Sequence, residues 1–324
     1  MTIHAFNNRI YVIGDIVMGG YSISDLWAIL AMQGFSGLSL FSVLLLMALG
    51  LAIIFGQMGV INMAHGEFMT IGAYTIYMFS KITAEYFPSL MPYYFVIAIF
   101  AAFGIAFAVG YLVEYLLIRH LYKRPLDTLL ATWGLSLIMQ QIFRTVFGAR
   151  EVSATLPDWL MGAWKPTPDI DIPLNGLFVM GISIVVTAAV ILFLYRSSWG
   201  LKVRATTQNR VMAGSVGINT KKIDRVTFAV GCGIAGIAGA TFTTIASTGP
   251  TSGSLYIVDT FLVVVFGGTG SVIGTVASAF SIAQAQSILT FFLTNAMGKV
   301  VTLLTIIIIL MLRPEGLFAS KVRK

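Results

Sequence analysis

The chain has 324 residues, of which 57% are hydrophobic and 10% are charged, and its mean hydropathy is +0.90. Soluble domains carry about 25% charged residues, so this composition excludes a water-soluble protein and predicts an integral membrane protein. Long unbroken apolar runs also exclude a transmembrane barrel, whose strands alternate apolar and polar residues, and the predicted fold is therefore an all-α polytopic membrane protein.

A membrane-spanning helix needs about 20 mainly apolar residues, or fewer where the helix is broken. This rule predicts about eight to ten membrane helices, some of them broken or half-length, in a single domain. The clear candidates are residues 38–55, 68–79, 93–118, 126–143, 177–195, 226–246, 272–292 and 300–312. Residues 27–33 predict an additional helix before the first span, and residues 257–266 form an apolar run too short to span alone.

Polar residues interrupt the apolar sequence between the first two spans. Asn62, His65 and Glu67 lie within six positions of one another, where side chains of this kind are costly in lipid unless they face protein or water. Gly56 and Gly59 can release helical backbone, and Asn62 can cap a helix that resumes near residue 63. The three polar side chains either line a solute path or satisfy broken backbone, with Glu67 at a membrane interface, and both roles are compatible.

A similar interruption is expected late in the chain. Residues 51–59 (LAIIFGQMG) and 262–270 (LVVVFGGTG) share the pattern L-x-[IV]-[IV]-F-G-x-x-G at an offset of 211 residues. Repeated halves with glycine-interrupted helices are typical of transporters, and chance similarity between apolar segments is the alternative. We expect an internal two-fold repeat, parallel or inverted, with hinges at Gly56, Gly59, Gly267, Gly268 and Gly270.

The basic residues predict the orientation of the chain. Of the 20 Lys and Arg residues, 14 lie in residues 119–124, in residues 196–225 and after residue 312. Positively charged loops remain in the cytoplasm, so these three regions, including the tail 319–324, are predicted to be cytoplasmic. The acidic loop 148–173 is predicted to be an ordered periplasmic cap. Since the basic residues lie between spans, the net charge of +7 does not indicate nucleic-acid binding.

No pattern in the sequence indicates catalysis. Residues 231–236 (GCGIAG) match the dinucleotide pattern G-x-G-x-x-G, but they lie inside an apolar helix with no strand before them. The small residues Gly231, Ala235, Gly236 and Gly239 instead predict a flat helix face for close packing. Neither a Ser-His-Asp set nor metal-ligand spacing is found, so we expect no catalytic residue and no metal site, and we do not expect an enzyme.

Residues 196–225 form the second informative segment, with seven basic residues and one acidic residue, Asp224. Residues 204–216 predict one short helix along the membrane face that ends at Gly217. A basic segment of this kind either serves topology and lipid contact alone or binds a partner.

Several motifs resemble the permease family of branched-chain amino acid ABC importers. Residues 50–74 are similar to the signature G-L-x-x-x-F-G-x-x-G-x-x-N-x-A-H-G, and residues 203–218 to the coupling segment R-A-x-x-x-N-x-x-x-A-x-x-x-G-I. Residues 256–279 and 313–318 (RPEGLF) are similar as well. The resemblance implies a permease domain over residues 38–318, preceded by an extension, residues 1–37. It implies that the ATPase-coupling residues are Arg204, Ala205, Asn209, Ala213, Gly217 and Ile218.

Two further segments, residues 124–141 (RPLDTLLATWGLSLIMQQ) and 157–162 (PDWLMG), resemble the urea branch of this family. The main expectation is therefore import of urea or short-chain amides by alternating access. A permease for branched-chain or polar amino acids is the alternative within the family. A passive channel for urea or water is the alternative from another class, and it would not require the long basic segment.

The resemblance also implies the partners and the location of the chain. It implies a multi-pass subunit of the bacterial inner membrane, paired with a second homologous permease as a heterodimer or homodimer. Two ATP-binding cassette subunits and a periplasmic solute-binding protein complete the complex. ATP and Mg²⁺ are used by the ATPase subunits, so no cofactor is expected in this chain.

A urea path should offer hydrogen-bond acceptors and a few donors without strong fixed charge. For Asp127, capping of the helix after Pro125 is the alternative role. The predicted path residues are Asn62, His65, Glu67, Asp127, Thr128, Gln140 and Gln141.

Overall fold

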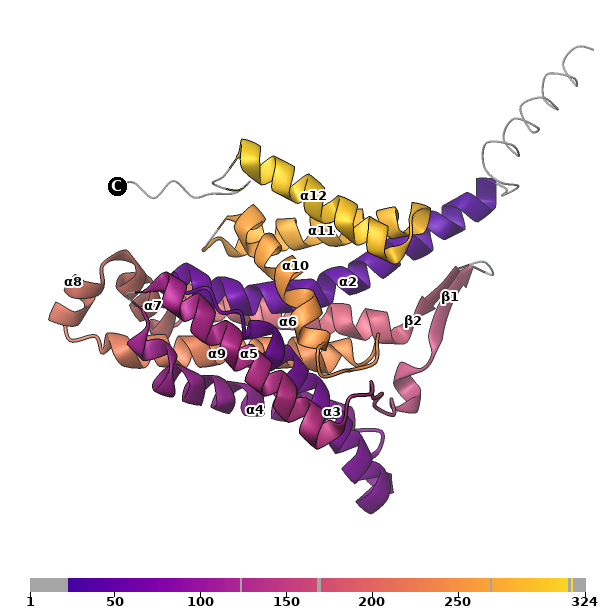
Figure 1. Cartoon of the computed structure of the whole chain (residues 1–324). Helices are drawn as coiled ribbons and strands as arrows, with labels where there is room; N and C mark the ends of the chain where they lie inside the picture. Colours follow the sequence, from indigo (N-terminus) through magenta and orange to yellow (C-terminus); the bar gives the residue numbers. More distant parts are fainter. Residues whose placement is uncertain (1–22, 123, 168–169, 269, 314–315, 317–324) are drawn as a thin grey trace, which may run out of the picture.

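The computed structural model describes residues 23–122, 124–167, 170–268, 270–313 and 316, and it confirms an all-α polytopic membrane protein (Figure 1). The expected extension before residue 23 and the tail 319–324 lie outside the described residues. The long helices are α2 (Ile23–Met58), α3 (His65–Tyr86), α4 (Tyr94–Leu116), α5 (Pro125–Phe147), α6 (Leu174–Arg196), α9 (Thr220–Phe242), α10 (Ser252–Gly267), α11 (Val272–Phe292) and α12 (Asn295–Leu312).

Short elements connect these helices. They are the 3-10 turns η1 (Pro88–Leu90), η2 (Ile118–His120) and η3 (Asp158–Leu160), the antiparallel strands β1 (Ala163–Thr167) and β2 (Ile170–Pro173), and the helices α7 (Ser198–Gln208) and α8 (Arg210–Ser215).

Five helices in the described residues, α2, α4, α6, α9 and α11, are long and apolar enough to cross a membrane, and α10 and α12 are shorter apolar helices. The expectation of a separate helix over residues 27–33 is wrong, because α2 is continuous over 36 residues. Gly34 and Gly37 do not break it, since a single glycine inside a long helix costs only about 1 kcal/mol. A Cβ at Gly37 would lie 2.6 Å from the amide oxygen of Gln284, so this glycine serves packing against α11.

Helix α9 forms the centre of the molecule, with α2, α3 and α4 packed around it. Backbone meets backbone at these contacts. A Cβ added at Gly239 would lie 1.8 Å from the carbonyl oxygen of Met69, and one at Gly72 would lie 1.9 Å from that of Gly236. Gly231 approaches the Gly50 carbonyl oxygen in the same way. The predicted flat helix face of small residues is therefore confirmed as a packing surface.

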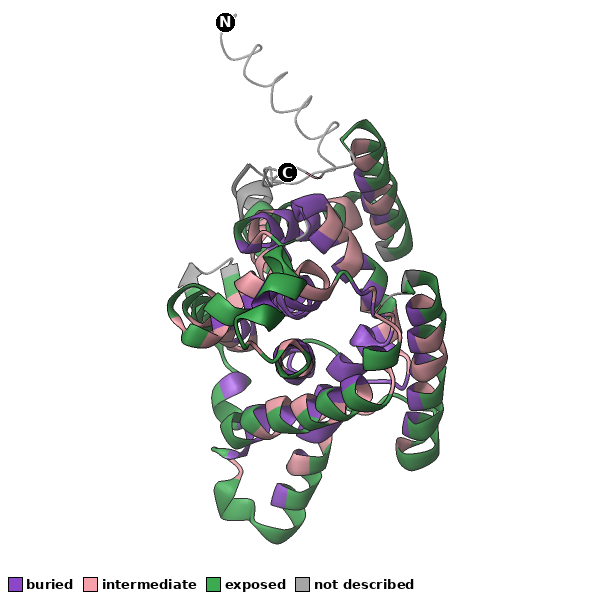
Figure 2. Cartoon of the chain, turned by 90° about the vertical axis from the view of Figure 1, so that its left-hand side faces the viewer, coloured by how far each residue is buried: buried purple, intermediate pink, exposed green. Residues whose placement is uncertain are grey.

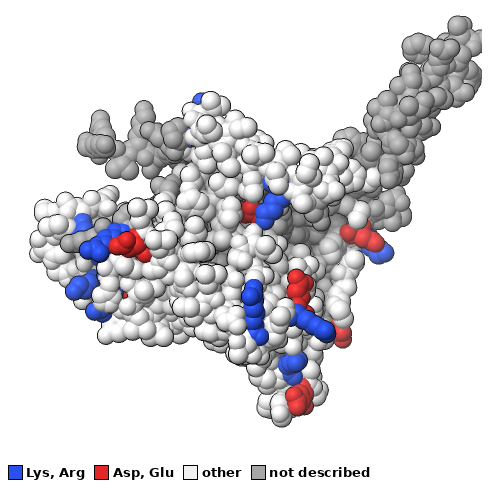
Figure 3. All heavy atoms as spheres, viewed as in Figure 1, with Lys and Arg blue, Asp and Glu red and all other residues white. Residues whose placement is uncertain are grey.

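The outer helices show the opposite pattern. Buried positions dominate α2 and α9, whereas α4 and α6 expose long apolar side chains such as Phe100 and Ile184. Exposed positions lie on the outer helices of the bundle (Figure 2). Charged atoms are sparse on the visible face of the molecule, most of which is uncharged (Figure 3). A polypeptide with apolar side chains on its outside is suited to lipid rather than to water.

The two ends of the helix bundle differ. One end carries α7 and α8, which lie beside the end of α2 and the start of α11 (Figure 1). Gly56 of α2, Arg204 of α7 and Gly270, just before α11, line one cavity at this end. The other end carries the β1–β2 hairpin. There the predicted cap is ordered, because Val152 pairs with Thr248 and the indole nitrogen of Trp159 donates to the Pro92 carbonyl.

The two similar segments run in the same direction. Helix α2 starts near β2, where Phe35 and Asp171 line one cavity together with Tyr256 near the start of α10. Both helices then end at the α7/α8 end, where a Cβ at Gly56 would lie 2.9 Å from the Cα of Gly270. The segments are thus arranged in parallel and touch at matching glycine motifs.

Candidate functional site

The helical structure is interrupted at the α2–α3 connection, between Met58 and His65. After α2 ends, Gly59 adopts a positive φ of 64°, and the next residues run back into the protein without helix. Helix α3 then begins with His65, whose Nε2 lies 3.2 Å from the carbonyl oxygen of Met47. Met47 lies about three helical turns before the end of α2, so α3 begins roughly 16 Å inside the bundle.

Side chains satisfy the broken backbone at this point. Asn62 Oδ1 accepts a hydrogen bond from the Ala64 N–H at 3.0 Å, and Thr132 Oγ1 accepts from the Met63 N–H at 3.1 Å. The predicted backbone role of Asn62 is confirmed, although the helix starts at residue 65 rather than 63, and its first residues have no side-chain cap. The expectation that Glu67 sits at an interface is wrong, because its side chain is fully buried.

One face of α5 covers Glu67. Ser136 Oγ and Gln140 Nε2 both donate to Glu67 Oε1 at 2.9 Å, and Gln140 Nε2 also lies 3.1 Å from Ser136 Oγ. Thr132, Ser136 and Gln140 are four residues apart and therefore share a helix face. We call Asn62, His65, Glu67, Thr132, Ser136 and Gln140 the polar cluster.

The polar cluster keeps unused hydrogen-bonding capacity. Glu67 Oε2, Asn62 Nδ2 and His65 Nδ1 are buried and have no hydrogen-bond partner among the described residues. Buried polar groups are normally paired, because desolvation without a partner costs about 1–3 kcal/mol. The cluster therefore holds an acceptor at Glu67 Oε2 and a donor at Asn62 Nδ2 that have no partner among the described residues, and protein encloses both side chains.

The other predicted path residues lie away from the cluster. Asp127 is exposed at the start of α5 and forms an ion pair with Arg124 at 3.5 Å. The buried Thr128 hydroxyl donates to the carbonyls of Leu121 and Arg124. Asp127 lies 13 residues before Gln140, about 20 Å along the helix. Gln141 is exposed, whereas its neighbour Gln140 is half-buried and donates to Glu67.

The predicted coupling segment consists of two helices instead of one. Asn209 leaves the helical conformation at φ −152° and caps α8, its Oδ1 accepting from the Met212 N–H at 3.0 Å. This residue strongly favours N-cap positions, which explains the break. Helix α8 ends at Ser215, and Gly217, the predicted terminating residue, follows with a φ of 84°, while the Ile218 N–H donates to the Ala213 carbonyl in a Schellman motif.

The predicted coupling residues differ in exposure. Arg204 points back into the permease, donating to the Leu194 carbonyl and lying 5.5 Å from the Tyr195 ring centre. Ala213 is buried and Ala205 is half-buried. Four large apolar side chains in α7, in α8 and just after α8 are exposed instead, and we call Leu201, Val211, Met212 and Val216 the apolar patch.

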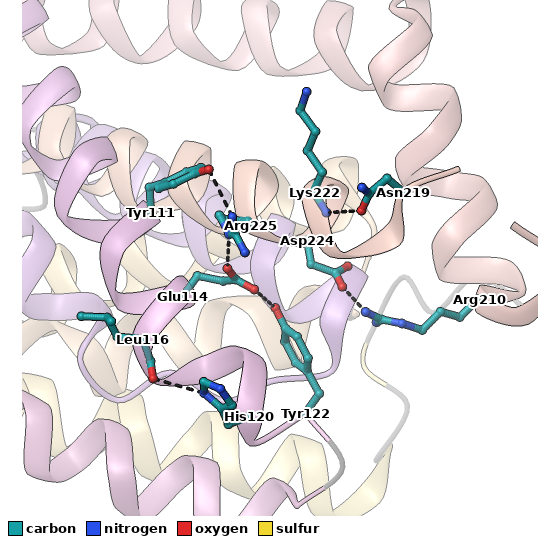
Figure 4. A network of polar contacts seen from close by, with 10 residues as sticks. All are labelled: Tyr111, Glu114, Leu116, His120, Tyr122, Arg210, Asn219, Lys222, Asp224 and Arg225. Carbon is teal, nitrogen blue, oxygen red and sulfur yellow. Dashed lines mark hydrogen bonds and ion pairs between the residues drawn. The ribbon is translucent and has the colours of Figure 1, made fainter. Parts of the chain in front are cut away.

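An ion-pair network ties α8 to the neighbouring helices (Figure 4). Arg210 of α8 pairs with the buried Asp224 of α9, and the next residue, Arg225, donates from Nε to Glu114 of α4 at 2.9 Å. The Tyr122 hydroxyl donates to the same Glu114 carboxylate at 2.6 Å.

Several of these residues were not predicted from the sequence. Thr132 and Ser136 could have been found from their four-residue spacing with Gln140 in an otherwise apolar helix. Glu114 is the one acidic residue within α4, and such a residue in an apolar helix indicates a buried partner. The Asp259–Lys299 pair between α10 and α12, at 2.8 Å, could have been recognised in the same way. Within the described residues, no three His, Cys, Asp or Glu side chains gather as metal ligands would.

Comparison with known proteins gives a consistent result. Residues 34–310 match the family described as the branched-chain amino acid transport system permease component. The chain is 27% identical over 293 residues to the high-affinity branched-chain amino acid transport system permease protein LivH of Escherichia coli (strain K12), a match that covers 88% of this chain and 94% of LivH. It is 26% identical over 289 residues to BraD of Pseudomonas aeruginosa, covering 87% of this chain and 93% of BraD.

A probable branched-chain amino acid transport permease protein LivH of Methanocaldococcus jannaschii is 25% identical over 298 residues, covering 85% of this chain and 88% of that protein. No solved structure matches the chain. The names of these relatives refer to amino acids and not to urea, so they favour the amino acid alternative over the expected urea assignment. With a match over residues 34–310, and with a polytopic helical fold, the chain belongs to the permease family of branched-chain amino acid ABC transport systems.

Proposed function

We propose that this chain is one permease subunit of an ABC importer for branched-chain amino acids in the inner membrane. The match to the permease family over most of the chain carries this proposal. A second permease, two ATPase subunits and a periplasmic binding protein complete the importer, and ATP is hydrolysed by the ATPase subunits. The α7/α8 end faces the cytoplasm, because the basic segment 196–225 lies there.

The polar cluster forms this subunit's contribution to the solute path. An amino acid carries an ammonium group and a carboxylate, and the buried cluster offers an acceptor at Glu67 Oε2 and a donor at Asn62 Nδ2. Glu67 lies in the first turn of α3, where the helix dipole favours a negative charge. Urea also needs acceptors and donors, and transport measurements distinguish it from an amino acid.

The apolar patch on α7 and α8 is the surface that we assign to the ATPase subunit. Its four large side chains are exposed at the basic end of the molecule, in the same segment as Arg210 and before the charged start of α9. Exposed apolar groups rimmed by polar residues are typical of protein interfaces. The glycines of the two matching motifs, Gly56, Gly59, Gly267, Gly268 and Gly270, are the proposed hinges of alternating access.

Uptake by the reconstituted importer tests the solute. The permease pair, the ATPases and the binding protein are placed in proteoliposomes and offered labelled leucine, urea or acetamide. We expect ATP-dependent accumulation of leucine and no accumulation of urea. Accumulation of urea alone would contradict the amino acid assignment.

Liposomes that contain this chain alone test the passive alternative. Helix α9 is packed against α2, α3 and α4, and we expect no leucine or urea flux without the ATPases. Flux through the isolated chain would contradict the importer.

A further inference from the structure

The ion-pair network near α8 lies outside the proposed solute path, but Tyr122 connects this network to α5, the helix that covers Glu67. Both oxygens of the buried Glu114 carboxylate are partnered, Oε1 by the Tyr122 hydroxyl and Oε2 by Arg225 (Figure 4). Tyr122 belongs to the short connection between η2 and α5. It therefore links helix α4 to the beginning of the helix that covers Glu67.

Helix α8 contacts Tyr122 through Arg210. The guanidinium of Arg210 pairs with Asp224 and lies 5.3 Å from the centre of the Tyr122 ring. Asp224 is buried, so separating it from Arg210 would leave an uncompensated charge, which is strongly destabilising. Arg210 thus lies between Asp224 of α9 and the Tyr122 ring, so a displacement of α8 relative to α9 changes the contact between Arg210 and Tyr122.

The Tyr122 hydroxyl keeps its proton and remains a donor. Tyr122 lies outside the membrane-spanning segments, where burial and then the hydrogen bond to Glu114 raise its pKa above the ordinary value for tyrosine. The link between Tyr122 and Glu114 is therefore present over the whole physiological pH range.

The connection that contains Tyr122 is fastened to α5. The Thr128 hydroxyl lies 2.9 Å from the carbonyl oxygens of both Leu121 and Arg124, which flank Tyr122 in the chain. The Arg124 N–H also donates to the Leu121 carbonyl at 2.9 Å, and Pro125 starts the helix with a fixed φ. These bonds make the connection and the first turn of α5 a single unit.

Helix α5 connects this series of contacts to the polar cluster. Thr132 holds the Met63 N–H, and Ser136 and Gln140 hold Glu67, all from one face of α5. A helix is stiff along its axis, so movement of its first turn moves Ser136 and Gln140 relative to α3. Thr128, Thr132, Ser136 and Gln140 follow one another at four-residue intervals along that face.

We propose that Tyr122 is a positioning residue that transmits displacement of α8 to α5, and through α5 to the hydrogen bonds that hold Glu67. The ring receives the displacement from Arg210, and the hydroxyl keeps the connection seated on Glu114. This inference rests on the proposed function, because α8 moves only if it is bound to an ATPase.

The test uses Tyr122→Leu and Tyr122→Phe in the complete reconstituted importer. Tyr122→Leu removes the ring and the hydroxyl, whereas Tyr122→Phe keeps the ring beneath Arg210. The control is Tyr115→Phe, which removes a hydroxyl at the same end from a ring that lies over Arg225 rather than Arg210. The measurements are complex stoichiometry, ATP hydrolysis and leucine accumulated per ATP hydrolysed. A fourth measurement is the ATP-dependent distance between spin labels at Leu137→Cys in α5 and Val185→Cys in α6.

We expect all variants to assemble with the ATPases and to hydrolyse ATP. Leucine accumulated per ATP should fall about tenfold in Tyr122→Leu, and less in Tyr122→Phe, because a hydrogen bond to a charged group and a cation–π contact are lost together in the first. The ATP-dependent distance change should disappear in Tyr122→Leu and persist in Tyr115→Phe.

Two results would overturn the inference. Unchanged leucine per ATP in both Tyr122 variants, with the distance change retained, would exclude transmission through Tyr122 while leaving the proposed function intact. If Tyr122→Leu fails to assemble, an unchanged ratio in Tyr122→Phe together with an unchanged distance change has the same meaning. Absence of ATP-dependent uptake in the unmodified importer would instead refute the proposed function, and the inference with it.

Discussion

Glu67 is the residue on which the proposed solute path depends most. Glu67→Gln keeps the size of the side chain and removes its charge, while Ser136 and Gln140 can still donate to the remaining carbonyl oxygen. We expect leucine uptake by the complete importer to fall about tenfold or more, since hydrogen bonds to charged groups contribute about 1.5–3 kcal/mol and 1.4 kcal/mol is a tenfold effect. Initial rates of uptake over a range of leucine concentrations measure this change.

Gln141→Leu is the matched control for this prediction. Gln141 follows Gln140 directly but is exposed on another face of α5. Its replacement should leave assembly and uptake near the unmodified level. Equal effects of Glu67→Gln and Gln141→Leu would remove Glu67 from the path.

Single glycines of the central helix α9 are expected to affect the stability of the folded protein. In Gly239→Ala, the new Cβ would lie 1.8 Å from the Met69 carbonyl oxygen, so α3 and α9 must separate. We expect the unfolding temperature of the detergent-solubilised protein to fall by several degrees, because backbone atoms cannot adapt as side chains can.

Gly104→Ala provides the comparison within another helix. Gly104 lies in α4 with nothing within 4 Å of the added Cβ, and alanine favours helix by about 0.5–1 kcal/mol. This variant should unfold at the same temperature as the original protein or slightly above it. A lower unfolding temperature for Gly104→Ala than for Gly239→Ala would refute the packing argument.

At the scale of elements, the apolar patch of α7 and α8 should determine ATPase attachment. Val211 is 79% exposed on α8, so Val211→Asp introduces a charge into the proposed interface without disturbing the permease core. We expect the ATPase subunits to co-purify in clearly reduced amounts, because an unpaired buried charge in an interface is costly. Met161→Asp, which introduces the same charge at an exposed residue of the opposite end of the bundle, is the control.

This choice of variant follows from the structure and not from the sequence. Arg204 is matched by the coupling pattern, but its side chain contacts Leu194 and Tyr195 inside the permease. Loss of ATPase binding in Arg204→Glu would therefore report damage to α6 and α7 as readily as a lost interface. Full ATPase co-purification with Val211→Asp would place the interface elsewhere.

The sequence predicted elements well where one physical rule dominated. Long apolar runs predicted the α4, α6 and α11 spans because membrane insertion requires them. The start of α3 and the break at Asn209 were less predictable, because buried partners and local capping decide them. The hydrogen bonds of Glu67 were not predicted, since Gln140 was expected only as a path residue and Ser136 was not expected at all. Contacts between distant segments such as α4 and the Tyr122 connection leave no local periodicity in a single sequence.

At the scale of the whole molecule, orientation is the property open to direct measurement. The β1–β2 hairpin and the α7/α8 end lie at opposite ends of the bundle (Figure 1). We expect Lys165→Cys in the hairpin to react with a membrane-impermeant thiol reagent added to intact cells. Lys202→Cys in α7 should react only after the membrane is opened, because basic segments remain in the cytoplasm.

The unmodified chain is the control for labelling, because its one cysteine, Cys232, is buried against Gly110 of α4. If Lys202→Cys were labelled in intact cells and Lys165→Cys were protected, the orientation of the chain in the membrane would be the opposite of the one proposed. This result would also move the ATPase-facing surface to the hairpin.

The glycine contacts of α9 bear on how such a bundle can change shape. Where carbonyl and Cα groups touch directly, no side chain can rotate to accommodate sliding, so α2, α3 and α9 form a fixed post. Conformational change is then left to the helices around the post that are less tightly joined to it, of which α5 is one. The inward-facing and outward-facing states of the importer should therefore differ in the positions of outer helices such as α5, while α2, α3 and α9 keep the same arrangement.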